Sequence, residues 1–183
     1  MPQKIFKYFS LISMPLFMVI ALLLIKKLPN FSFKKHTISK TVYFLKHPIN
    51  MFIFRMNFIV KAILDLGFVY YLKFHFKISN PLAFLLILSV ILFGSLSYFI
   101  MGKYTISHKI IIYSYIALWS IFQIYFSQLT GNIFFLKLTY FLTAIELLLS
   151  FGFLFAKKTN VFVQAVCAFL SYGWLVIFVF RFL

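Results

Sequence analysis

The chain has 183 residues, of which 64% are hydrophobic and only 11% are charged, whereas soluble domains are typically about half apolar and a quarter charged. This composition excludes an ordinary water-soluble domain, and the apolar content is about what six membrane spans of about 20 residues would need. The formal net charge of +16 would suggest nucleic acid in a soluble chain. Here, however, Lys and Arg stand mostly at the ends of apolar runs, where they can reach anionic lipid headgroups. We therefore expect membrane lipids as partners and no nucleic acid.

The apolar runs follow one another in chain order. The first, residues 8–25, ends at Lys26 and has no small-x-small cleavage site, so we expect a retained span rather than a signal peptide. A longer polar connection, residues 28–50, follows, and we expect it to lie outside the hydrocarbon. The other predicted spans are residues 51–72, 81–101, 110–129, 133–156 and 161–182.

The breaks between the later runs are short, which implies antiparallel neighbours. The sequence therefore predicts an all-α protein, an integral membrane bundle of six transmembrane helices that forms a single domain. It would be a multi-pass protein, located in the cell (inner) membrane if the source is prokaryotic. The sequence does not predict its oligomeric state.

Charged residues inside a span are costly and normally face protein or water. In the span 51–72, Asn57, Lys61 and Asp65 stand at intervals of four and lie on one helix face. Lys61 and Asp65 can neutralise each other, which is a structural interpretation. A functional role, in handling protons or headgroups, is the alternative.

The span 133–156 carries the other acidic residue of the chain, Glu146. An isolated carboxyl group in a membrane is expected to be neutral or hydrogen-bonded, and it could be structural or a functional acid. Other polar residues line up at helical spacing on the inner faces of three spans. They are Thr139, Thr143 and Ser150 beside Glu146; Ser120, Gln123 and Ser127; and Gln164, Cys167, Ser171 and Trp174. Interhelical hydrogen bonding and a polar cavity for a headgroup or an ion both explain such stripes, and they leave the spans 8–25 and 81–101 as the most lipid-like.

Motifs for known catalytic chemistry are few. The four histidines fall in loops or at span edges, without the spacing of a zinc-binding helix, and no nucleophile elbow or phosphate-binding loop occurs. Cys167 is the only cysteine, so it can form neither an intramolecular disulfide nor a cysteine metal site. We expect no metal and no cofactor, and we assign no catalytic residue.

Two short elements resemble a known superfamily. After the first span the sequence reads Pro29, His36-Thr37-Ile38-Ser39 and Pro48, and before the fourth span it reads from Gly102 to Ser107-His108. This resembles the six-helix membrane superfamily that includes the damage-regulated autophagy modulators, the GPI-anchor-remodelling Frag-type proteins, the Sfk-type lipid-asymmetry proteins and uncharacterised prokaryotic relatives. The resemblance implies six spans and a cytoplasmic amino terminus. The count of basic residues in the connections instead favours both termini outside, so orientation stays open.

The leading functional hypothesis is a non-enzymatic membrane protein with a role in lipids or membrane homeostasis. A small proton-coupled transporter that uses Asp65 and Glu146 is one alternative, and an intramembrane lipid-modifying enzyme with His108 as base is another. The candidate binding residues are His36, Ser39, Lys61, Asp65, His108, Gln123, Glu146 and Gln164. We expect convergence of these side chains on one cavity to favour a functional site over structural packing.

Overall fold

A computed structural model describes residues 3–99, 104–155 and 160–183. Within these residues the secondary structure is entirely helical. The elements are α1 (Gln3–Phe6), α2 (Phe9–Lys26), the 3-10 helix η1 (Ile38–Lys40), α3 (Thr41–Phe44), α4 (Pro48–His75), α5 (Asn80–Ser95), α6 (Thr105–Leu129), α7 (Ile133–Phe155) and α8 (Val161–Phe182).

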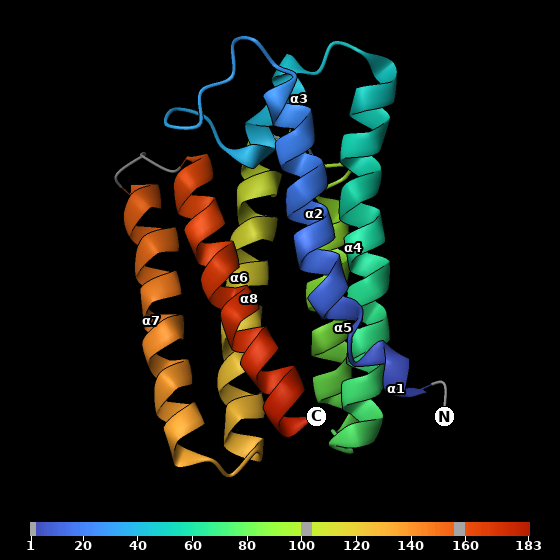
Figure 1. The fold of residues 1–183 in the computed structure, drawn as a ribbon, viewed down its shortest axis with the longest axis vertical. Helices are drawn as coiled ribbons and strands as arrows, with labels where there is room; N and C mark the ends of the chain where they lie inside the picture. Colours follow the sequence, from blue (N-terminus) through green and yellow to red (C-terminus); the bar gives the residue numbers. More distant parts are fainter. Residues whose placement is uncertain (1–2, 100–103, 156–159) are drawn as a thin grey trace.

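The long helices α2, α4, α5, α6, α7 and α8 run along the long axis of the molecule (Figure 1). Each packs against the next one along the chain, and α8 returns to contact α2, so the helices close into a ring. Both termini lie at one end of this bundle, and the connection from α2 to α4 lies at the other (Figure 1). Antiparallel packing of successive helices, expected from the short connections, is confirmed.

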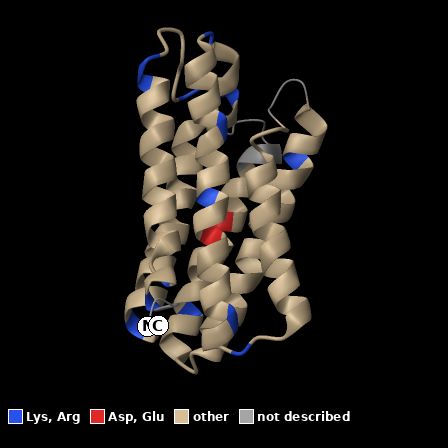
Figure 2. Cartoon of the chain, turned by 90° about the vertical axis from the view of Figure 1, so that its right-hand side faces the viewer, with Lys and Arg blue, Asp and Glu red and all other residues tan. Residues whose placement is uncertain are grey.

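Within the described part of the chain, four helical segments are long and apolar enough to cross a membrane: Lys4–Lys26, Thr105–Leu129, Ile133–Gly152 and Val161–Phe182. α4 is not among these segments because every stretch of 18 residues within it carries three charged residues, namely Lys61, Asp65 and either Arg55 or Lys73. α5 is apolar but has only 16 residues. Elsewhere, Lys and Arg gather towards the two ends of the bundle, and acidic residues stand near its middle (Figure 2). The prediction of an all-α fold is thus confirmed, and the four candidate spans are consistent with a membrane protein.

Several helix ends differ from the predicted spans. α4 begins at Pro48, where the missing N–H of proline costs nothing in the first turn, and α6 begins at Thr105, so the predicted break before residue 110 is largely helical. α5 ends at Ser95, earlier than residue 101, because the following N–H groups form tighter bonds: Leu96 donates to the Phe93 carbonyl and Ser97 to that of Gly94. The remainder of that predicted span, residues 100 and 101, lies outside the described residues, as does residue 156.

The connection of residues 28–47, here called the cap segment, folds back over one end of the bundle. Ile38, Val42 and Leu45 are buried there in a hydrophobic cluster with α2 and α4. The cap segment is also bonded to the start of α8: the backbone N–H of Ile38 donates to Gln164 Oε1 at 2.7 Å, and that of Val161 donates to the His36 carbonyl at 2.8 Å. What the sequence suggested as a polar loop is therefore a packed structural element.

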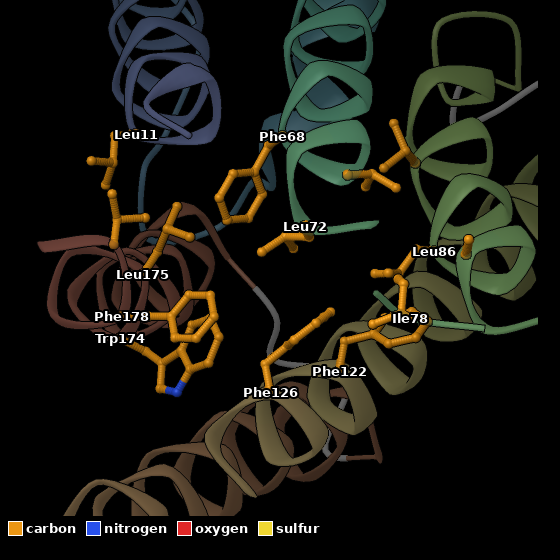
Figure 3. Packing of buried hydrophobic residues seen from close by; sticks show 14 of the residues in the cluster. Leu11, Phe68, Leu72, Ile78, Leu86, Phe122, Phe126, Trp174, Leu175 and Phe178 are labelled. Carbon is orange, nitrogen blue, oxygen red and sulfur yellow. The ribbon is translucent and has the colours of Figure 1, made fainter. Parts of the chain in front are cut away.

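Two hydrophobic clusters hold the bundle together. The first contains aromatic and aliphatic side chains from all six long helices. Among them are Phe68, Phe126 and Phe178, which converge in Figure 3. The second joins α2, the cap segment, α4 and α5 around Phe54, Phe58 and the rest of that cluster. The polar site described next borders residues of both clusters.

Candidate ligand cavity

One cavity of about 490 Å³ lies inside the bundle and is lined by side chains from the cap segment and from all six long helices. It brings together six of the predicted binding residues: Ser39, Lys61, Asp65, His108, Glu146 and Gln164. Two predicted residues do not line it. His36 packs against Phe31 and Phe44 within the cap segment and accepts a hydrogen bond from the Ser32 N–H on Nδ1, and Gln123 lies between helices beside the cavity.

The cap end of the cavity is a cationic and hydroxyl-rich rim formed by Thr37, Ser39, Lys40, His108 and Lys109. Lys109 is exposed and Lys40 is half-buried, whereas Ser39 and His108 are buried. The first turn of α6 also lies here, and the amino-terminal end of a helix carries a partial positive charge. An anionic group at the rim would therefore meet charge of the opposite sign.

His108 is held in a defined tautomer. Its Nδ1 lies 2.6 Å from the Phe99 carbonyl oxygen, and because a carbonyl can only accept, Nδ1 carries the hydrogen. Nε2 is buried and has no hydrogen-bond partner among the described residues. The imidazole thus keeps Nε2 as a buried hydrogen-bond acceptor without a partner among the described residues.

Asp65 and Lys61 form an ion pair on α4, one turn apart. The other carboxylate oxygen of Asp65 accepts hydrogen bonds from Ser10 at 2.8 Å and from Ser13 at 2.6 Å, both on α2. The Lys61 ammonium group also lies 4.7 Å from the centre of the Phe93 ring, a cation–π contact. Asp65 therefore joins α2 to α4, and the structural interpretation of this pair gains direct support. Asn57, two turns before Asp65, also joins these helices by donating to the Phe17 carbonyl at 2.9 Å.

Glu146 is in a different situation, since no cation pairs with it among the described residues. It is 3% exposed, and its Oε1 has no hydrogen-bond partner there. Ser171 and Gln123 are the polar side chains within interaction range of the carboxyl group, but both amide atoms of Gln123 also lack a properly aligned hydrogen bond. Of the two acidic residues, Glu146 is the one that has no cation and keeps an unpartnered oxygen among the described residues.

Two contacts set the register of α6 against α7. The Tyr113 ring packs on Phe151, and the Gln128 amide reaches the Tyr140 hydroxyl. By interpolation between these two contacts, Glu146 on α7 faces the part of α6 near Ser120. Ser120 is 12 residues after His108, so the Glu146 carboxyl group lies about 18 Å from His108 along the axis of α6. His108 and Glu146 thus belong to opposite ends of the same cavity.

The other polar stripes are also buried, as expected. Ser120, Gln123, Ser127, Thr139 and Thr143 are each at most 4% exposed. Thr139 accepts a hydrogen bond from the Trp174 indole at 2.9 Å, which joins α7 to α8. Cys167 lines the cavity, with its sulfur 3.6 Å from the Ser150 hydroxyl.

Sequence analysis missed Ser10 and Ser13, because α2 was expected to be one of the most lipid-like spans. The signal was present: two serines three residues apart in an otherwise apolar run lie on one helix face. It also missed the rim residues Lys40 and Lys109. These looked like ordinary span flanks, and only the folding of the cap segment over the bundle places them at a cavity.

The chain was compared with protein-family models, curated proteins and solved structures, and none of them matches it.

Proposed function

We propose that the chain is a six-span membrane protein that binds a membrane amphiphile in this cavity, with the headgroup at the rim. The role is one in lipid binding or membrane homeostasis rather than catalysis, in line with the resemblance to the Frag-type superfamily. The observation that carries the proposal is the distribution of the lining: cationic and hydroxyl groups at the cap end and largely apolar walls beyond it.

Outward-facing side chains support six spans. α4 exposes Phe52, Ile63 and Phe74, each by more than half, and the 22 residue steps from the first to the last cover about 33 Å of helix. That length matches the hydrocarbon thickness of a bilayer, about 30 Å. α5 likewise exposes Phe84 and Ile91. α4 can therefore present an apolar face to lipid, because its inward-facing charges, Lys61 and Asp65, are paired with each other.

The cavity walls suit an alkyl chain. Between the rim and Glu146 the lining includes Phe17, Phe93, Leu96, Ile112 and Val163. A volume of about 490 Å³ lies within the usual range of ligand pockets, about 300–1,000 Å³. An amphiphile would satisfy both parts of the lining, whereas a wholly polar solute would leave apolar walls facing it.

The geometry favours this proposal over both alternatives. A transporter that protonates Asp65 would have to break the ion pair with Lys61 and the bonds from both serines, so such a mechanism would depend on Glu146 alone. An enzyme that combines His108 with a carboxyl acid needs the two groups within about one water molecule of each other. The register of α6 and α7 separates His108 from Glu146 by far more, and Asp65 is engaged by Lys61, Ser10 and Ser13.

The test is lipid retention measured by native mass spectrometry. The protein would be reconstituted in vesicles of phosphatidylethanolamine and phosphatidylglycerol and released into detergent, and the variant K40Q/K109Q would remove both rim cations. We expect its retained lipid to fall at least fivefold. The control variant K77Q/K137Q removes two exposed lysines near the opposite end of the bundle and should retain lipid like the original protein. Equal retention by both variants, or no retained lipid at all, would refute the proposal.

A further inference from the structure

The cavity is long in the direction of the bundle axis. Its lining on α6 runs from His108 to Trp119, and its lining on α8 runs from Val163 to Leu175. At 1.5 Å per residue these stretches cover about 16 Å and about 18 Å. An extended chain of single bonds advances about 1.2 Å per bond, so an alkyl chain of about 13 to 15 carbons would reach from one end to the other.

The volume sets a second limit. A cavity of about 150 Å³ holds benzene, which corresponds to about 25 Å³ for each carbon atom. By the same measure, 490 Å³ takes about 20 non-hydrogen atoms, close to the ~18 of hexadecanoate and less than half of those in a diacyl phospholipid. One alkyl chain of about 16 carbons therefore fits both the length and the volume of the cavity.

The first hydrophobic cluster offers no space for a second acyl chain. A second pocket among the described residues has a volume of about 10 Å³ and mostly apolar walls that include Phe122 and Phe126. It lies in the first hydrophobic cluster, whose aromatic rings pack against one another: Trp174 and Phe178 are 4.9 Å apart, centre to centre. That part of the bundle is a filled core.

We infer that the ligand is a single-chain amphiphile with a compact anionic headgroup, bound with the headgroup at the rim and the chain directed towards Glu146. A fatty acid and a lysophospholipid share this chemistry. The inference rests on the proposed function and narrows it, since it assigns the cavity to one alkyl chain and excludes a fully enclosed diacyl lipid. Lys40 and Lys109 of the rim are the groups that contact the anion.

The first experiment is a competition read by native mass spectrometry. The intact protein would be delipidated in detergent and offered hexadecanoate, palmitoyl lysophosphatidic acid, dipalmitoyl phosphatidic acid and inorganic phosphate at equal concentrations. We expect the two single-chain ligands to be retained at least tenfold more than the diacyl lipid, and phosphate alone not to be retained. Retention of the diacyl lipid at the same level would overturn the inference and leave the proposed function standing. Retention of none of the lipids would overturn both.

A matched pair of variants on α8 tests the location. Ala168 lines the cavity, whereas Ala165, on the same helix and similarly half-buried, does not. We expect A168F to fill the cavity and lower hexadecanoate retention at least tenfold, and A165F to leave it within twofold. If both variants bound like the original protein, the chain would not lie in this cavity.

The unique Cys167 supplies a second readout, which needs no mass measurement. Its thiol lines the cavity, so bound hexadecanoate should slow its reaction with N-ethylmaleimide at least tenfold. In the variant C167S/S171C the thiol lies one turn deeper, about 12 Å from Val163. There hexadecanoate should still protect, whereas octanoate, about 9 Å long, should not. Equal protection by the two fatty acids at the deeper position would contradict the proposed direction of the chain.

Discussion

The ion pair of Lys61 and Asp65 gives the sharpest prediction about stability. Both residues are buried, with Lys61 5% and Asp65 9% exposed, and the Asp65 carboxylate bonds Lys61, Ser10 and Ser13 at once. The variant D65A removes all three interactions and leaves a buried ammonium group without a counterion. Breaking a buried pair in this way costs about 3–5 kcal/mol, and two stranded serine hydroxyls add about 0.6 kcal/mol each at the level typical of membrane bundles.

The double variant K61M/D65L separates the charge from the packing. It removes both charges together and keeps side chains of similar length, so the stranded charge disappears while the serines still lose their acceptor. Replacing a buried pair by apolar residues is often neutral or stabilising. We therefore expect the double variant to recover more than half of the stability lost in D65A.

The measurement is unfolding of the purified protein in mixed micelles with increasing sodium dodecyl sulfate, followed by circular dichroism. The variant I63A, on the exposed face of the same helix, is the control and should change the free energy of unfolding by less than about 1 kcal/mol. A D65A protein as stable as I63A would refute the structural role of the pair. A double variant no more stable than D65A would refute the argument that the stranded ammonium group dominates the cost.

Three further predictions use the same assay. Removing both hydroxyls, as in S10A/S13A, should cost about 1–3 kcal/mol, because each bond ends on a charged acceptor. A loss below about 0.3 kcal/mol would contradict the two hydrogen bonds to Asp65. G94A should cost about 1–3 kcal/mol, because its new Cβ would lie 3.0 Å from the Cβ of Ala62 on α4. The control G173A, with open space around the new Cβ, should be neutral or stabilising by up to about 1 kcal/mol. Equal effects of the two substitutions would refute the close packing of α4 against α5. E146Q should change stability by less than about 1 kcal/mol because no cation pairs with this carboxyl group, and a loss above about 3 kcal/mol would reveal a partner that the geometry does not show.

Much of the bundle could be predicted from hydropathy and helical periodicity. Long apolar runs separated by Pro, Gly or Lys fixed the order of the helices, and the spacing of Asn57, Lys61 and Asp65 identified a buried face of α4. These patterns are local, since they depend only on residues a few positions apart. Helix ends were less predictable: polar residues at the start of α6 look like a loop in the sequence, yet a helix continues through them.

The cavity depends on contacts between distant parts of the chain, and the sequence indicates such contacts only weakly. Gln164 looked like one member of a polar stripe, but its side chain bonds the backbone of Ile38, 126 residues earlier. That bond holds the cap segment against α8 and places Ser39 and Lys40 at the cavity rim. No periodicity within either segment could have shown that they meet.

The different surroundings of the two acidic residues explain how one bundle can be stable and still hold a site. The Asp65 carboxylate is bonded by Ser10 and Ser13 of α2 and by Lys61 of α4. Asp65, Lys61 and Ser10 form part of the cavity wall. Glu146 and His108 keep an unpartnered buried atom each, at opposite ends of the same space. Leaving such atoms unsatisfied costs about 1–3 kcal/mol each, and the filled contacts of Asp65 with α2 and α4 offset that cost.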